Sequence, residues 1–153
     1  VTRSLLWNEG LDFGHGTGHG VGAFLGVHEG PQRISAFAGD VGFRSGMIIS
    51  NEPGYYRTGW GGIRLENLYV VQSATQHPRH PDGKKWLCFD TLTLIPFERK
   101  LVCEELLTED EWNWLQHYHK RVWEEISPLL NEDGEKEYLQ QACDWSQRLQ
   151  AAA

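Results

Sequence analysis

Three histidines, His15, His19 and His28, lie within fourteen residues of this chain and are surrounded by glycines. Imidazole exchanges protons near neutral pH and is a common metal ligand, so this segment has the groups for acid–base or metal chemistry. The simpler interpretation is a flexible glycine-rich loop that happens to carry histidines. The GxGxxG and GxxxxGK[ST] patterns of dinucleotide and phosphate loops are not present, which disfavours those two functions.

Two glutamates further along the chain are candidates to complete a site. Glu52 directly follows the apolar run 47–51, where a carboxylate is costly unless something pairs with it. Arg64 and Glu66 are two residues apart in the strand-like run 63–71, so they share one face. If the two runs pair as a hairpin, Glu52 and Glu66 come near one another. They then repel unless a cation or a shared proton lies between them.

A set of imidazole and carboxylate ligands suits Mn²⁺, Fe²⁺, Co²⁺ or Zn²⁺. Histidines that are not ligands would remain to handle protons or substrate oxygens. The residues alone therefore indicate metal-assisted hydrolysis.

The elements that position these groups follow from local patterns. The run 1–7 is typical of the last turns of an amphipathic helix that ends near Gly10. Because it lacks an initiator Met, we expect the chain to be a piece of a longer protein. Apolar patterns predict strands at 47–51 and 63–71, and either one bent strand or two consecutive strands over 86–90 and 91–95.

The last third of the chain changes character and predicts two helices. Thr108 and Glu111 form a capping box, and apolar residues follow at helical spacing up to Leu129. A second helix follows the loop 131–134. Its predicted apolar face carries Tyr138, Ala142, Trp145 and Leu149. The many tryptophans of this region indicate either packing on the strand domain or a dimer surface.

Composition excludes several classes of function. The net charge is −7, and no basic cluster is longer than Lys84-Lys85, which disfavours binding to nucleic acid. The three cysteines lack CxxC spacing, which is typical of reduced thiols in the cytoplasm. No apolar run approaches the ~20 residues that span a bilayer, and no signal peptide is evident, so we expect a cytoplasmic protein without a membrane partner.

Four motifs resemble the second half of the aminopeptidase P family, the Xaa-Pro aminopeptidases among the pita-bread metallopeptidases. They are His15-Gly-Thr-Gly-His19-Gly-Val-Gly, His28-Glu-Gly-Pro31, Asn51-Glu52-Pro53-Gly54-Tyr55-Tyr56 and Gly62-Ile-Arg64-Leu-Glu66-Asn67. The region from Leu92 through the tryptophan-rich helices is similar to the C-terminal region of the large cytosolic type. Many relatives have Asp where Asn67 stands, but the large cytosolic members resemble this chain there.

The resemblance implies an α+β fold. Residues 1–100 would form the second half of a pita-bread catalytic domain with antiparallel strands. Residues 101–153 would form a C-terminal helical extension that can mediate homodimerisation.

The resemblance also implies roles for individual residues. His19, Glu52 and Glu66 would be metal ligands in a site for two divalent ions, most readily Mn²⁺, with Zn²⁺ or Co²⁺ as alternatives. Glu52 would also act as general base. His28 would bind substrate and move protons at the scissile carbonyl, while His15 and Arg64 would line or support the substrate site. The substrate would be a peptide with proline at its second position.

The family's two aspartate ligands lie upstream of the matched region, so we expect this chain alone to be inactive and the longer protein to be the enzyme. Three other interpretations stay open. One is a non-catalytic binding module on the same fold, and another is a related hydrolase such as a prolidase, creatinase or methionine aminopeptidase. The third is a fragment that only associates through residues 108–150.

Overall fold

A computed structural model describes residues 2–24, 26–37, 39, 41–74 and 86–148 of the chain. The chain forms two compact units, Val1–Thr93 and Leu94–Ala153. The division into a half-domain and a helical extension near residue 100 stays a prediction. His77 and His80, expected on the surface, lie outside the described residues. No helix in the described ranges is both long enough and apolar enough to cross a membrane.

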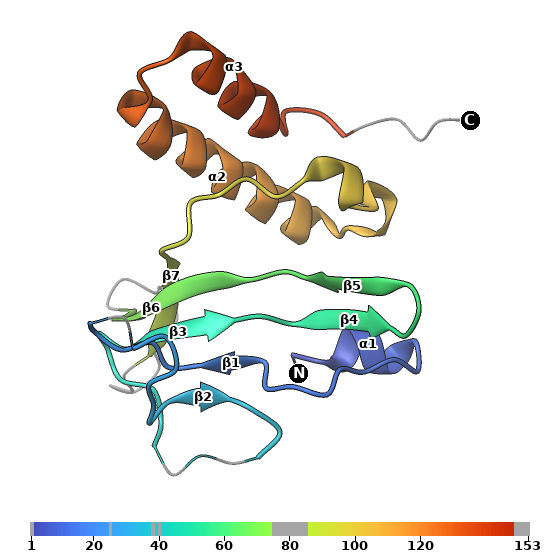
Figure 1. Cartoon of the computed structure of the whole chain (residues 1–153), viewed down its shortest axis with the longest axis vertical. Helices are drawn as coiled ribbons and strands as arrows, with labels where there is room; N and C mark the ends of the chain where they lie inside the picture. Colours follow the sequence, from blue (N-terminus) through green and yellow to red (C-terminus); the bar gives the residue numbers. More distant parts are fainter. Residues whose placement is uncertain (1, 25, 38, 40, 75–85, 149–153) are drawn as a thin grey trace. The chain divides into compact units, whose positions relative to one another are not determined.

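The first unit is built from short antiparallel strands (Figure 1). Helix α1 (Ser4–Asn8) ends before Gly10, whose φ of 69° suits glycine in the expected position after a helix. Strand β1 (Gly18–His19) pairs with β2 (Arg33–Ile34). Strands β3 (Ile48–Asn51), β6 (Asn67–Ser73) and β7 (Leu87–Thr91) form a three-stranded sheet in that order. Strands β4 (Gly54–Arg57) and β5 (Gly61–Arg64) form a separate two-stranded sheet.

The expected hairpin is confirmed, but it is longer than predicted and interrupted. In Figure 1, β3 and β4 follow one another along one arm, and β5 and β6 along the other. The single strand expected over 63–71 is therefore wrong, because pairing breaks between Arg64 and Asn67. Pro53 lies opposite this break and has no N–H to donate, so only its carbonyl oxygen is paired, with the Leu65 amide at 3.1 Å.

Of the two alternatives for 86–95, the described residues form a single strand, β7, which ends at Thr91 and is shorter than the predicted run. One backbone hydrogen bond continues past β7, from the Leu92 amide to the Leu68 carbonyl oxygen at 2.8 Å, and a side-chain contact follows it. The Leu68 amide donates to the Thr93 hydroxyl at 2.8 Å.

The second unit is helical. Two short 3₁₀ turns, η1 (Arg99–Leu101) and η2 (Glu104–Leu106), precede α2 (Glu109–Ile126). The capping box is confirmed, because the Thr108 hydroxyl accepts from the Glu111 amide and the Glu111 carboxylate accepts from the Thr108 amide. A 3₁₀ turn η3 (Ser127–Leu129) follows, and then α3 (Asp133–Ala142) lies beside α2 (Figure 1).

The core of the second unit corrects the predicted face of the last helix. Leu139, not Tyr138, is buried and packs with Tyr118 and Val122 of α2. Tyr138 is 71% exposed. Trp145 lies beyond the end of α3 but is buried, and it packs with Trp112 and Leu115. Leu149, which we also expected on this face, is outside the described residues.

Candidate active site

Strands β1 and β3 bring His19 and Glu52 together. His19 ends β1, and Glu52 follows β3 directly. The two strands approach closely because Gly18 has no side chain: a Cβ there would overlap the Ser50 carbonyl oxygen. Nε2 of His19 lies 3.1 Å from Oε1 of Glu52.

Glu52 is a buried carboxylate with several partners. The Ser50 hydroxyl donates to Oε1 at 3.0 Å, and Nη1 of Arg64 donates to Oε2 at 3.0 Å. The Glu52 amide donates to the Thr17 carbonyl oxygen at 2.7 Å. The same Ser50 oxygen accepts from the His19 amide at 2.9 Å, so one hydroxyl links both site residues. These contacts offset the cost of burying the charge.

The tautomer of His19 follows from its other nitrogen. Nδ1 lies 2.9 Å from the Gly20 carbonyl oxygen, which can only accept, so Nδ1 carries a proton. In the neutral ring, Nε2 then presents its lone pair to a carboxylate oxygen. Two lone pairs that face one another are unfavourable unless a proton or a cation lies between them. This arrangement of an oriented imidazole and a carboxylate is typical of a metal ligand pair.

A second chain of hydrogen bonds joins Arg64 to His15. Nε of Arg64 donates to the Tyr56 oxygen at 2.9 Å, and the same oxygen lies 2.7 Å from Nε2 of His15. Nδ1 of His15 lies 2.7 Å from the Gly16 carbonyl oxygen, so Nε2 is the acceptor and the Tyr56 hydroxyl donates to it. The hydrogen bond to Tyr56 raises the pKa of Arg64, and the nearby carboxylates Glu52 and Glu66 add to that effect.

The remaining predicted residues lie at the rim. The ring of His28 is 4.2 Å from the ring of His19, between centroids. Oε2 of Glu66 is 3.9 Å from Nη1 of Arg64, the nitrogen that also binds Glu52. Both glutamates therefore flank one guanidinium, as the predicted hairpin required.

Within the described residues, the site has some of the groups that a metal ion needs but not a complete set of ligands. No group of three His, Cys, Asp or Glu side chains there is arranged to hold an ion. His19 and Glu52 already converge, and their donor atoms suit a borderline divalent cation. Glu66 contacts the guanidinium of Arg64 that also binds Glu52, and the assignment of these three residues as metal ligands stays a prediction.

Two residues at the site were not among the predicted site residues. Ser50 is two residues before Glu52, which directly follows β3, so the alternation of side chains along an extended chain places both on the same face. Tyr56 stands in the quoted motif, but nothing in its local sequence shows that its hydroxyl bridges Arg64 and His15. That contact depends on the β4–β5 pairing.

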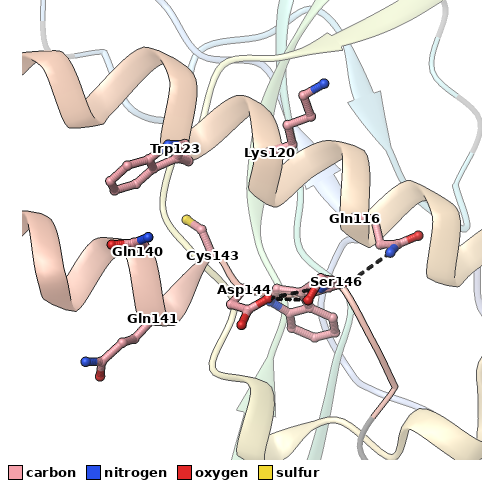
Figure 2. A pocket seen from close by; sticks show the side chains of 9 residues that line it. Gln116, Lys120, Trp123, Gln140, Gln141, Cys143, Asp144 and Ser146 are labelled. Carbon is pink, nitrogen blue, oxygen red and sulfur yellow. Dashed lines mark hydrogen bonds between the residues drawn. The ribbon is translucent and has the colours of Figure 1, made fainter.

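A pocket in the second unit carries different chemistry. It has a volume of about 710 Å³ and lies between α2 and the end of α3. Figure 2 shows Lys120 and Trp123 on one side and Cys143 and Asp144 on the other. Burial raises the pKa of the Cys143 thiol to about 11, which leaves it a poor nucleophile. The Asp144 carboxylate accepts from the Ser146 hydroxyl at 2.7 Å.

Comparison with known proteins agrees with the motifs. The profile of Metallopeptidase family M24 matches residues 1–73, and that of the C-terminal region of peptidase_M24 matches residues 85–145. The chain belongs to metallopeptidase family M24.

Curated relatives of this M24 chain are Xaa-Pro aminopeptidases. Xaa-Pro aminopeptidase 1 of Dictyostelium discoideum is 47% identical over 147 residues, which are 95% of this chain and 22% of the relative. Aminopeptidase P2 of Arabidopsis thaliana is 49% identical over 138 residues, which are 90% and 19% of the two chains. The chain thus spans about a fifth of the length of these relatives.

A solved structure confirms the fold. The X-prolyl aminopeptidase of Caenorhabditis elegans, described as a cytosolic enzyme with a di-nuclear active site, has a TM-score of 0.80 and 38% identity. The match covers 96% of this chain and 23% of that one. The predicted α+β architecture with part of a pita-bread domain is therefore confirmed, as is the resemblance to aminopeptidase P.

Proposed function

We propose that this chain supplies part of the active site of a metal-dependent Xaa-Pro aminopeptidase. The observation that carries the proposal is the buried Glu52 carboxylate facing the oriented His19 imidazole at 3.1 Å, in a chain whose M24 relatives are named for this activity. The chain covers 22% of the Dictyostelium relative, so the activity belongs to a longer polypeptide that completes the site.

In this proposal His19, Glu52 and Glu66 are ligands of two divalent metal ions, with Mn²⁺ the first choice and Zn²⁺ or Co²⁺ the alternatives. When bound, such ions would activate a water molecule and stabilise negative charge on the carbonyl oxygen of the substrate. Arg64 holds the two glutamates on one guanidinium, which limits the repulsion between them.

The chain's own residues have distinct roles. Glu52 accepts a proton from the attacking water, because its second oxygen is held by Arg64 and its first faces the centre of the site. His28, whose ring lies beside that of His19, binds the substrate and helps to move the proton taken up by Glu52 to the leaving nitrogen. His15 lines the substrate pocket, and its ring is held by the Tyr56 hydroxyl.

The proposed substrate is a peptide with proline in the second position. The bond before proline is a tertiary amide without an N–H, so the substrate has one hydrogen-bond donor fewer by which the enzyme can recognise it. Correct placement of its carbonyl group by fixed side chains is then especially important. Because the Caenorhabditis elegans enzyme is described as cytosolic, we propose a cytosolic location for this protein as well.

A chimera provides the test. Residues 1–153 would replace the segment that they match in the Caenorhabditis elegans enzyme, where the similarity covers 96% of this chain. We expect the chimera to cleave Xaa-Pro peptides and not Xaa-Ala peptides. Glu52→Gln should reduce kcat by roughly 100-fold or more, because it removes the base. Glu124→Gln, on an exposed turn of α2, is the matched control.

Inactivity of the chimera, or equal cleavage of Xaa-Pro and Xaa-Ala peptides, would contradict the proposal. A folded and inactive chimera would favour a binding module, and cleavage of other substrates would favour a related hydrolase. The experiment therefore distinguishes a binding module and a related hydrolase from the proposed Xaa-Pro aminopeptidase.

We further propose that residues 101–153 mediate homodimerisation. Leu106 is 79% exposed and Trp114 is 44% exposed in the second unit, and aromatic and apolar side chains of this kind are common in interface cores. A Trp114→Gln variant should lower the mass measured by light scattering from that of a dimer to that of a monomer.

A further inference from the structure

Arg3, which stands outside all four motifs, contacts the backbone that carries His15. One terminal nitrogen, Nη1, donates to Oδ1 of Asp12 at 2.6 Å and to the Phe13 carbonyl oxygen. The other, Nη2, donates to the carbonyl oxygen of His15. One guanidinium thus holds three successive points of the chain between α1 and β1.

The surroundings of Arg3 restrict its movement. Its side chain is only 12% exposed, although it lies near the start of the chain. The guanidinium carbon is 3.8 Å above the centre of the Phe13 ring, and that ring is buried. The Phe13 ring in turn lies 4.8 Å from the ring of His15. Arg3 therefore reaches His15 through both the backbone and a ring contact.

Asp12 completes the arrangement on the other side. Its hydrogen bond from Arg3 lowers the pKa of the Asp12 carboxyl, so the pair stays charged at neutral pH. The Asp12 carboxylate also accepts from the Phe13 amide at 2.8 Å. Carboxylate, guanidinium and backbone form a closed set of contacts around residues 12–15.

We propose that Arg3 is a positioning residue, which fixes the backbone at Phe13 and His15 so that Nε2 of His15 meets the Tyr56 hydroxyl. The geometry favours arginine, because a planar guanidinium directs several N–H groups at separate oxygens. A lysine ammonium at the same place could keep the charge over the Phe13 ring but could not reproduce the fork. The effect on catalysis rests on the proposed function of His15.

The test uses NMR on the whole 153-residue chain at a fixed pH. Cross-peaks between the rings of His15 and Tyr56 report the arrangement directly, since their centroids are 5.3 Å apart. Arg3→Ala should lose these cross-peaks, while those between His19 and His28 persist. Arg3→Lys should weaken them without unfolding the unit. Arg44→Ala, an exposed arginine of the same unit, is the matched control.

Full-strength His15–Tyr56 cross-peaks in both Arg3 variants would overturn the proposal. If Arg3→Ala does not fold, Arg3→Lys decides: a folded variant with wild-type cross-peaks overturns the proposal, and a folded variant with weakened ones supports it.

In the chimera, Arg3→Lys should raise KM roughly tenfold with kcat nearly unchanged, because a substrate-lining side chain is displaced. An inactive wild-type chimera would contradict the proposed function but leave the ring contacts as a separate test of Arg3.

Discussion

Tyr56 connects the two halves of the candidate site at the level of single residues. Its oxygen accepts a hydrogen bond from Arg64 at 2.9 Å, and its hydroxyl donates one to Nε2 of His15 at 2.7 Å. Arg64 at the same time binds Glu52. A change at the hydroxyl therefore reaches both the substrate-side histidine and the proposed base.

Tyr56→Phe removes only this hydroxyl. In the chimera we expect kcat/KM to fall by roughly ten- to 100-fold, because Arg64 and His15 each lose a charged or polar partner. Steady-state kinetics on an Xaa-Pro peptide measures the effect, with Tyr138→Phe on the exposed face of α3 as control. An unchanged kcat/KM in Tyr56→Phe would show that the bridge has no role.

His119 gives a pH dependence to the second unit. It is fully buried, its Nδ1 lies 2.7 Å from the Leu115 carbonyl oxygen, and its Nε2 accepts from the Phe97 amide at 3.1 Å. Burial lowers the pKa of His119, and the charge of Arg99 adds to this. Protonation would also remove the acceptor that Phe97 uses.

Because the folded pKa is below the unfolded value of about 6.5, the stabilisation by neutral His119 is complete above that pH. It is lost as the pH falls from there through the folded pKa. We expect the melting temperature to be lower by roughly 5 °C at a pH below the folded pKa of His119 than at neutral pH. His119→Gln should show a smaller fall, and an equal fall in both proteins would assign the effect to other groups.

At the scale of elements, one close approach decides whether the site can form. Strand β1 packs on β3 only because Gly18 lacks a Cβ. Gly18→Ala should destabilise the chain by about 1–3 kcal/mol, as overpacking against a fixed backbone does. Gly14→Ala is the matched control, since no described atom lies within 4 Å of the added methyl group. Chemical denaturation measures both, and equal stability of the two variants would contradict the packing argument.

Helix α2 depends on its first turn. The hydrogen bonds from the Thr108 amide and hydroxyl lower the pKa of Glu111, so the capping carboxylate stays charged. Thr108→Ala should cost about 1 kcal/mol, and Thr108→Ser should restore most of it because serine caps equally well. The comparison is made by thermal unfolding. A serine variant as unstable as the alanine variant would mean that the cap is not the cause.

Sequence patterns predicted the elements whose signals are local. The capping box, the buried strand before Glu52 and the helix end near Gly10 each depend on a few adjacent residues, and all three are confirmed. The strand at 63–71 was wrong because its break is imposed by Pro53 on the opposite arm. The face of α3 was wrong because Leu139 and Tyr138 are both apolar enough, and only packing against Tyr118 selects between them.

At the candidate site too, local motifs were predictive and contacts between distant residues were not. Motif spacing selected His19, Glu52, Arg64 and Glu66, whose roles stay predictions. The hairpin does bring the two glutamates near one another, on either side of Arg64. The contacts of Tyr56 and Arg3 could not be predicted from the residues next to them in the sequence. Each acts through residues about ten or more positions away, across a loop or a strand pair.

On the scale of the whole molecule, we propose that the chain supplies some of the ligands of a larger metal centre. The described residues bring His19 and Glu52 together without a third ligand in place. The matched relatives are about five times longer, as the 22% coverage of the Dictyostelium protein indicates. We therefore propose that this chain contributes three ligands, His19, Glu52 and Glu66, to a two-metal hydrolase.

The metal content of the purified chimera tests that claim most directly. We expect about two divalent ions per polypeptide in the wild-type chimera, as in other two-metal hydrolases, and at most about one in Glu66→Ala. Elemental analysis after dialysis gives both numbers. A Glu66→Ala chimera that is folded and still retains two ions would contradict the assignment of Glu66 as a ligand and with it the proposed centre.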